Sequence, residues 1–277
     1  MAEFSWTHWH WHPDIILGVL LLEGLYLLGV GGMRRRYGWA ERVPTRQVVY
    51  FTLGVLVIYV ALSSPLHELS DNFLFSAHMV QHLLLMLLMP PLLLWGTPPW
   101  LLRPLLRHPL MERSARFITS PLPAFILFTT VFFVWHLPAL YDLALRNHSV
   151  HILEHLLFMA AALVMWWPVL GRLSELPRPS YPIQMLYLFF LSLPPGFLGA
   201  AITFSGDVLY PWYGEVPRLW GLSALTDQQI GGLIMKIPGA LVFLAAMGVV
   251  FFTWFNQEES DPQDRSLGQE LLTSGRK

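Results

Sequence analysis

Two pairs of histidines, each separated by four positions, are the residues of this sequence best suited to chemistry. The first pair is His78 and His82, and the second is His151 and His155. Residues four apart in an α-helix share one face and lie about 6 Å apart along the axis. Each pair can therefore present two imidazoles to one metal ion. Imidazole suits copper, zinc and iron, whereas thioether sulfur favours Cu(I).

Single residues elsewhere in the chain could complete such a site or orient its ligands. His136 is a candidate fifth imidazole, and Met235 is a candidate soft ligand. Neighbouring polar groups commonly accept a hydrogen bond from the second ring nitrogen of a ligating histidine and fix its tautomer. The candidates for supporting roles are His67, Glu68, Gln81, Glu154, Asp227 and Gln228. For Asp227, capping of a helix N-terminus is an equally good interpretation.

The elements that carry these residues are typical of a membrane protein. Of the 277 residues, 55% are hydrophobic and 13% are charged, against about 25% charged in an ordinary soluble domain. Apolar runs of roughly 20 residues recur along the chain, long enough to cross a bilayer as helices. The sequence therefore predicts an all-α, polytopic bundle of seven transmembrane helices. The predicted spans are 15–33, 47–64, 76–95, 121–138, 151–170, 183–203 and 229–255.

Arginine is distributed unequally between the loops at the two ends of these helices. If the N-terminus is outside, the outer loops carry only Arg146 and Arg218, and the inner loops carry the other loop arginines. Short cytoplasmic loops are enriched in Lys and Arg. We therefore expect the N-terminus outside and the C-terminus in the cytoplasm. The inner arginines are Arg34, Arg35, Arg36, Arg42, Arg46, Arg103, Arg107, Arg113, Arg116, Arg172 and Arg178.

On this topology nearly all histidines fall at the outer end of the bundle. Of the 11 histidines, only His108 lies on the inner side. A lone histidine at a helix end is usually an interfacial anchor or a satisfied polar group. Two pairs at matched depth are not explained in that way, because burying many polar rings in a membrane costs free energy unless they are paired. The pattern favours a metal or haem site at the outer face.

The two ends of the chain differ from the spans. No Lys or Arg precedes the first apolar run, so we expect a retained first span and not a cleaved signal. The polar arm before it is either a metal-catching segment or a Trp-rich interfacial belt. We divide the chain into a membrane domain, 1–256, and an acidic cytoplasmic tail, 257–277, expected to be disordered. The arm contains His8, Trp9, His10, Trp11 and His12.

Two charged residues fall inside predicted spans. Glu23 lies about eight residues below the outer end of the first span, and Lys236 about seven below that of the last. Because their depths match, the sequence predicts a buried ion pair between them. The alternative is that backbone or water satisfies each charge separately.

The composition also excludes several kinds of site and partner. The chain has no cysteine, so it has no disulfide, no thiolate zinc site, no cysteine-ligated iron–sulfur cluster and no cysteine nucleophile. Its formal net charge of -1 gives no indication of a partner. No basic, aromatic patch of the kind found in nucleic-acid-binding proteins is present, so we expect no nucleic-acid partner.

Three segments resemble the multi-spanning bacterial CtaG family of cytochrome c oxidase assembly proteins. They are SAHMVQHLLLMLLMPPLLLWGTP (76–98), WHLPALYDLALRNHSVHILEHLLF (135–158) and DQQIGGLIMKIPG (227–239). The resemblance implies a non-enzymatic assembly factor in the bacterial inner membrane. It also implies haem-copper oxidase subunits as partners, with membrane lipids and a copper donor protein as further contacts. Carried over by position, the motif residues are His78, His82, His136, His151, His155, Asp227, Gln228 and Met235.

The sequence leaves several functions open. Copper is the first expectation, with the oxidase as the recipient of the metal. Haem is the alternative, because imidazoles from two helices can serve as axial ligands. The segment 151–155 also fits the H-x-x-E-H pattern of one metalloprotease class, with Glu154 as the acidic residue. A lysine in the seventh span invites comparison with retinal proteins, with Glu23 as counter-ion to Lys236, but that comparison leaves the histidines unexplained.

Overall fold

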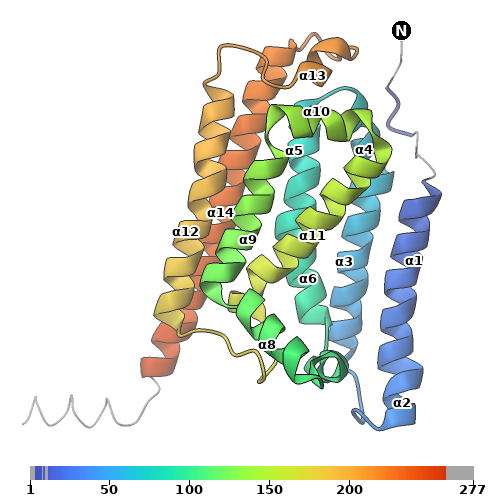
Figure 1. The fold of residues 1–277 in the computed structure, drawn as a ribbon, viewed down its shortest axis with the longest axis vertical. Helices are drawn as coiled ribbons and strands as arrows, with labels where there is room; N and C mark the ends of the chain where they lie inside the picture. The colour runs from blue at the N-terminus through green and yellow to red at the C-terminus, as the bar shows by residue number, and fades with distance from the viewer. Residues whose placement is uncertain (1–3, 8, 10–11, 260–277) are drawn as a thin grey trace, which may run out of the picture.

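The computed structural model describes residues 4–7, 9 and 12–259, and within these residues the chain is helical and contains no β-strand (Figure 1). Its elements are α1 (Pro13–Leu28), the π-helical turn η1 (Gly29–Met33), α2 (Arg34–Tyr37), α3 (Thr45–Ser63), α4 (Pro65–Asn72), α5 (Phe75–Leu83), the π-helical turn η2 (Leu84–Leu88), α6 (Met89–Gly96), α7 (Pro99–Leu102), the 3₁₀ turn η3 (Arg103–Leu106), α8 (Pro109–Ile118), α9 (Pro121–Trp135), α10 (Pro138–Arg146), α11 (His148–Leu170), α12 (Tyr181–Thr203), α13 (Pro211–Glu215) and α14 (Ala224–Glu259).

Six helices of the described part of the chain are long and apolar enough to cross a membrane. A seventh span is formed if α8 and α9, which meet at an angle of 70°, are counted together. The prediction of an all-α bundle with about seven spans is confirmed. The six are Pro13–Tyr37, Thr45–Ser63, Phe75–Gly96, His148–Leu170, Tyr181–Thr203 and Ala224–Glu259.

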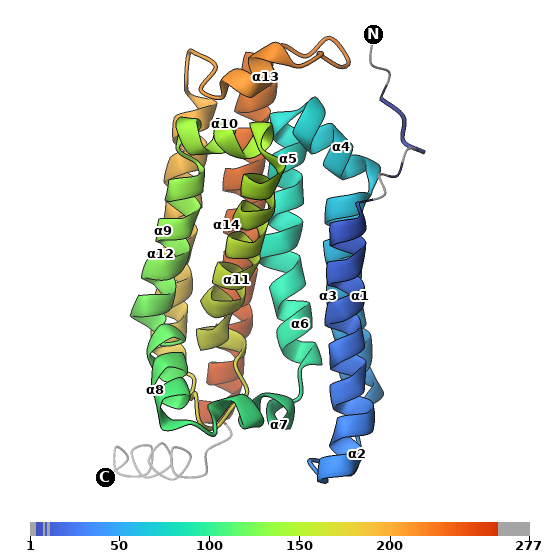
Figure 2. The same ribbon diagram turned by 45° about the vertical axis from the view of Figure 1, so that its right-hand side comes forward.

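The spans run roughly parallel, with short helices covering each end (Figures 1 and 2). Helices α4, α10 and α13 cover the end at which α1 begins, and α2, α7 and α8 lie at the opposite end. Residues 257–259, which we assigned to the tail, are the last turn of α14. The rest of the predicted tail, 260–277, lies outside the described residues.

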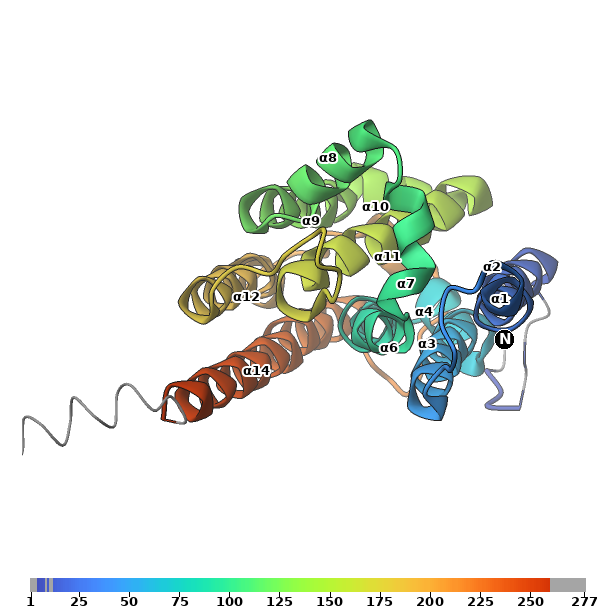
Figure 3. The same cartoon turned by 90° about the horizontal axis from the view of Figure 1, so that it is seen from below.

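Two glycines allow a close approach between the last two spans. Helices α12 and α14 pack along much of their length (Figure 3). A Cβ atom on Gly232 would lie 2.7 Å from the carbonyl oxygen of Gly199. Small residues at this crossing let the two backbones touch, as is common between membrane helices.

The helical hydrogen bonding of the third span is interrupted at Met86, one turn after His82. This interruption provides a contact with α11. Pro90 has no N–H, so the carbonyl of Met86, four residues earlier, lacks its helical donor. The indole Nε1 of Trp166, on α11, donates to that oxygen at 3.0 Å. The break therefore fastens α5 and α6 to α11, the helix that carries the second histidine pair.

The predicted ion pair between Glu23 and Lys236 is wrong. Glu23 accepts a hydrogen bond from Thr52 on α3 at 2.7 Å. Lys236 is exposed on α14, next to Gly199 of α12. Helices α1 and α14 lie on opposite sides of the bundle (Figure 3), so matched depth did not bring the two charges together. The retinal comparison thereby loses its counter-ion.

Candidate metal site

The two histidine pairs meet inside the bundle. Helix α5 carries His78 and His82, whose ring centroids are 4.3 Å apart, and α11 carries His151 and His155, 4.4 Å apart. Between the helices, the ring of His78 lies 5.9 Å from that of His151, and the ring of His82 lies 5.5 Å from that of His155. All four side chains are buried. We call these four residues and His136 the histidine cluster.

His136 adds a fifth imidazole from a third helix. It ends α9, and its Nδ1 lies 2.7 Å from the carbonyl oxygen of Phe132. A carbonyl only accepts, so Nδ1 carries the proton and Nε2 keeps its lone pair. The ring lies 6.2 Å from that of His82. The backbone of α9 thus fixes the tautomer that leaves Nε2 able to bind a metal.

Most ring nitrogens of the histidine cluster have no hydrogen-bond partner among the described residues. Both nitrogens of His78, His82 and His155 are unpartnered, as are Nε2 of His136 and of His151. An unsatisfied buried polar group costs about 1–3 kcal/mol. Eight such atoms would cost an amount comparable with the whole stability of a typical domain, about 5–15 kcal/mol. Packing alone does not explain why these positions are imidazoles.

A buried carboxylate faces the cluster. Glu154 is 1% exposed, and its Oε1 has no hydrogen-bond partner among the described residues. One carboxylate oxygen of Glu154 and one ring nitrogen each of His78 and His82 lie within 4.8 Å of one another. Glu154 was predicted to support a ligand, and this position allows it to be a ligand itself.

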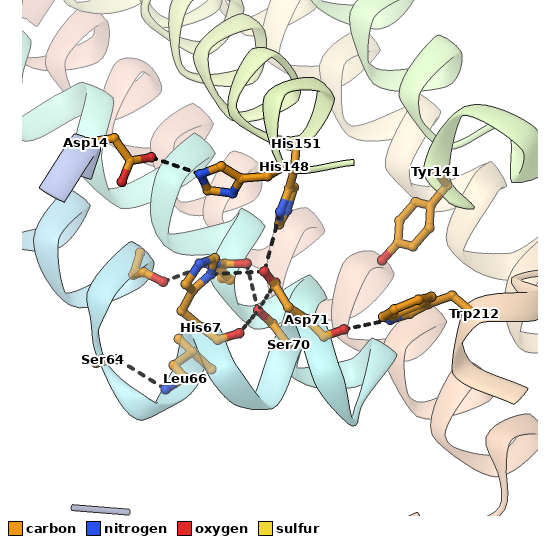
Figure 4. Close-up of polar contacts among 12 residues, drawn as sticks. Asp14, Ser64, Leu66, His67, Ser70, Asp71, Tyr141, His148, His151 and Trp212 are labelled. Carbon is orange, nitrogen blue, oxygen red and sulfur yellow. Dashed lines mark hydrogen bonds and ion pairs between the residues drawn. The ribbon is translucent and has the colours of Figure 1, made fainter. Parts of the chain in front are cut away.

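Asp71, on α4, is a residue that the sequence analysis missed. Its Oδ2 lies 3.4 Å from Nδ1 of His151 and 3.5 Å from Nδ1 of His67 (Figure 4). Asp71, His78 and His151 offer ligand atoms within 4.8 Å of one another. The available signal was the spacing of His67 and Asp71, which puts an imidazole and a carboxylate on one face of a short helix.

Gln81 orients the outer side of the cluster. Its amide nitrogen lies 2.8 Å from the carbonyl oxygen of Ala61 and 3.0 Å from Nδ1 of His67, and its oxygen accepts from Ser70 Oγ at 3.0 Å. The amide nitrogen can only donate, so Nδ1 of His67 accepts. We expected Gln81 to accept from a histidine, and here it donates to one.

Asp227 positions the helix that carries the first histidine pair. Its carboxylate is fully buried and accepts hydrogen bonds from the backbone N–H groups of Phe75 and Ser76 at 2.8 and 3.1 Å. It also pairs with Arg218 at 3.2 Å. Asp227 therefore caps α5, although it lies on α14. The N-cap role is present, but on a different helix.

The remaining predicted residues, Gln228, Met235 and Glu68, have surroundings of other kinds. Gln228 accepts from the backbone N–H of Leu209 at 2.7 Å and donates to the carbonyl of Asp207 at 3.1 Å, so it holds the loop after α12. Met235 is buried in the main hydrophobic core. Glu68 lines a cavity above the cluster together with His67.

Aromatic rings enclose the cluster. The ring of Phe158 lies 4.7 Å from that of His82, Phe132 lies 4.5 Å from His136, and Tyr141 lies 5.1 Å from His78. Burial, reinforced by Tyr213, raises the pKa of the Tyr141 hydroxyl well above its ordinary value, so this wall stays neutral. On this side the wall around the imidazoles is aromatic and uncharged.

Two cavities connect the cluster with the surroundings. One, of about 300 Å³, lies beneath α10 and is lined by His12, His67, Asp71, His148 and His151, among others. The second, of about 350 Å³, lies between α1, α3 and α11 and reaches His155. In the N-terminal arm, the ring of His12 lies 5.2 Å from that of His67, whereas His8, His10 and Trp11 lie outside the described residues.

Comparison with known proteins identifies the family. The profile of the family described as cytochrome c oxidase caa3 assembly factor matches residues 24–257. Uncharacterized proteins of Mycobacterium bovis and Mycobacterium tuberculosis are each 27% identical over 258 residues, which is 85% of this chain and 38% of theirs. One of Mycobacterium leprae is 26% identical over 86% of this chain and 39% of its own. The chain therefore spans about two fifths of these curated relatives. No solved structure matches it.

Proposed function

The chain belongs to the cytochrome c oxidase caa3 assembly factor family, and from that membership we propose that it binds copper in the histidine cluster and delivers it to a haem-copper oxidase. In this proposal copper is bound temporarily and passed on, and it is not a resident cofactor of the protein. The recipient is an oxidase subunit, the membrane is the bacterial inner membrane, and the cluster faces its outer side. On this proposal the protein is not an enzyme.

The observation that carries this proposal is the set of buried ring nitrogens without partners. Eight nitrogens of five imidazoles have no partner among the described residues, and they converge from α5, α9 and α11. Buried polar groups in a membrane segment are expensive and as a rule functional. Metal coordination would use the lone pairs of these nitrogens. If the positions served packing alone, an apolar ring such as phenylalanine would be more favourable than histidine.

The nitrogen-rich donor set favours copper over metal ions that prefer sulfur or oxygen ligands. Imidazole binds copper, zinc and iron, and at a given nitrogen site copper is the strongest of the common divalent ions. The chain has no cysteine to compete for the metal. The ligands would be drawn from His78, His82, His151, His155 and His136, with Glu154 as an additional oxygen donor.

Surrounding residues would keep the ligands in place before the metal arrives. Asp227 fixes the start of α5, and the Trp166 bond to Met86 holds α5 and α6 against α11. The rings of Phe132 and Phe158 pack against His136 and His82. Rigid support of this kind lowers the free-energy cost of assembling a metal site.

The test is the metal content of the purified full-length protein and of a double variant, His82→Phe/His155→Phe. Phenylalanine preserves ring volume and removes four of the unpartnered nitrogens. Copper is supplied, excess metal is removed with EDTA and gel filtration, and metal is measured by mass spectrometry together with an absorption spectrum. We expect copper in the wild type and at least about 10-fold less in the double variant.

A matched control is His108→Phe, which removes the one histidine at the opposite end of the bundle and should retain copper. The double variant should melt, in chelator, at the same temperature as the wild type or higher, because unsatisfied polar atoms have been removed. Unchanged copper content in the double variant would exclude the cluster. A haem absorption band that the double variant loses would replace copper with haem. No bound metal or pigment in the wild type would leave a scaffolding role in assembly.

A further inference from the structure

The possible ligand atoms of the histidine cluster and its neighbours fall into two overlapping groups, one of which extends to Asp71 on α4. Asp71, His151 and His78 form one group of ligand atoms within 4.8 Å of one another, and His78, His82 and Glu154 form another. We call the first group the access site and the second the deep site. The two groups share one residue, His78.

The two sites differ in exposure. The side chain of Asp71 is 21% exposed and lines the cavity of about 300 Å³ beneath α10. The members of the deep site are 0–1% exposed. An ion coming from the end of the bundle therefore meets the access site before it meets the deep site.

The imidazoles continue outward from the access site without a long gap. The ring of His151 lies 6.0 Å from that of His67, which in turn lies 5.2 Å from that of His12. His12 lies 6.1 Å from His148 at the exposed rim. Each step is similar to the spacing between neighbouring rings inside the histidine cluster.

Asp71 is held where it can serve as a ligand. Its Oδ1 lies 2.8 Å from Ser70 Oγ, and its backbone carbonyl accepts from the indole of Trp212 at 2.6 Å (Figure 4). Both contacts fix the residue while Oδ2 faces His67 and His151. Carboxylate with imidazole is a donor set that suits a divalent transition-metal ion.

We propose that Asp71, His151 and His78 form a separate access site for a divalent metal ion, from which the ion moves to the deep site while His78 stays bound. The ion exchanges Asp71 and His151 for His82 and Glu154, so one ligand is kept throughout and no change of oxidation state is required. This inference rests on the proposed function, because it assumes that the deep site takes up copper.

The test uses Cu(II) as the probe on the detergent-purified full-length protein. Uptake is started by rapid mixing, stopped with EDTA and read as copper retained. Asp71→Asn keeps the shape of the side chain and its contact with Ser70. It should load on the order of 10-fold more slowly than the wild type and reach the same final content. Glu215→Gln, a carboxylate at the same end but paired with Arg146 at 2.8 Å, is the control and should load normally.

A second measurement isolates the access site. In the His82→Phe/His155→Phe background we expect weak Cu(II) binding that EDTA removes, with an electron paramagnetic resonance signal that adding Asp71→Asn abolishes. The access site would be overturned if Asp71→Asn loaded copper at the wild-type rate, or if the weak signal did not depend on Asp71. The proposed function would remain. Wild-type protein that retains no copper in EDTA, yet keeps the Asp71-dependent weak signal, would overturn the deep copper site instead.

Discussion

At one end of the bundle, the imidazoles of the histidine cluster are buried and mostly without partners among the described residues, whereas at the other end arginines are largely exposed and several of them are bonded. Arg34 donates to the carbonyls of Val30 and Ala40, each at 2.8 Å, and Arg178 donates to that of Val169 at 3.1 Å. Arg103 pairs with Glu175 at 2.9 Å. In the histidine cluster, by contrast, only Nδ1 of His136 and Nδ1 of His151 have such partners, and the other eight ring nitrogens have none among the described residues.

In our proposal, this difference reflects ligand binding at one end and anchoring of the spans at the other. Arginines that donate to carbonyls near helix ends satisfy groups that the helix leaves free, and their charges remain near water. We expect these arginines to lie on the cytoplasmic side. Buried imidazoles without partners contribute nothing comparable to stability, which is why we assign them to ligand binding. The two arginines at the histidine end are both paired with acids, Arg146 with Asp142 and Glu215, and Arg218 with Asp227.

The largest effect is expected in a test of which end of the bundle faces the outside of the cell. The natural chain has no cysteine, so a single cysteine can be placed at either end without background. Asp207→Cys lies between α12 and α13, at the histidine end, and Arg107→Cys lies between η3 and α8, at the arginine end; both side chains are exposed. In intact cells, a membrane-impermeant maleimide should label the first and not the second, because arginine-rich loops stay in the cytoplasm.

Labelling in permeabilised cells is the control, and both positions should then react. If intact cells label Arg107→Cys alone, the histidine cluster faces the cytoplasm. Delivery of copper at the outer face would then be excluded.

The next effect concerns stability at the histidine end. Asp227→Ala should lower the free energy of unfolding by about 3–5 kcal/mol, because it leaves Arg218 and the first N–H groups of α5 without their buried partner. Unfolding of the detergent-solubilised protein in denaturant measures this. Asp207→Ala, whose side chain is exposed, should change stability little. A small loss in Asp227→Ala would mean that α5 is positioned by packing alone.

The smallest effect is expected at the arginine end. The pKa of Glu175 is lowered by its own backbone N–H, by Ser174 and by the charge of Arg103. A carboxylate with a lowered folded-state pKa stabilises the protein above its unfolded pKa, and this contribution is lost as pH falls through the folded value. Glu175→Gln should therefore be slightly less stable than the wild type at neutral pH.

The stability difference between the two proteins should disappear in acid. Thermal melting of both between pH 3 and pH 7 tests this, and the neutral-pH difference should shrink with added salt, because exposed pairs are screened. Melting curves that differ equally at all pH values would mean that the effect of Glu175 is not electrostatic.

Several features could be predicted from the sequence because they depend on local periodicity. A bilayer demands about 20 apolar residues in a helix, and this requirement located six spans and α9 within a few residues. The helical repeat puts residues four apart on one face, so the pairing of His78 with His82 and of His151 with His155 followed directly. The family resemblance was confirmed by the match over residues 24–257.

Only the tertiary structure decided which spans face one another. It brought α5 against α11, added Asp71 from α4 to the imidazoles, and used Asp227 of α14 to cap α5. It also separated Glu23 from Lys236, which the sequence placed at matched depth. Depth along a span can be read from the chain, because each residue advances a helix by a fixed rise. The neighbours of a span depend on side-chain packing between segments far apart in sequence, which no local pattern encodes.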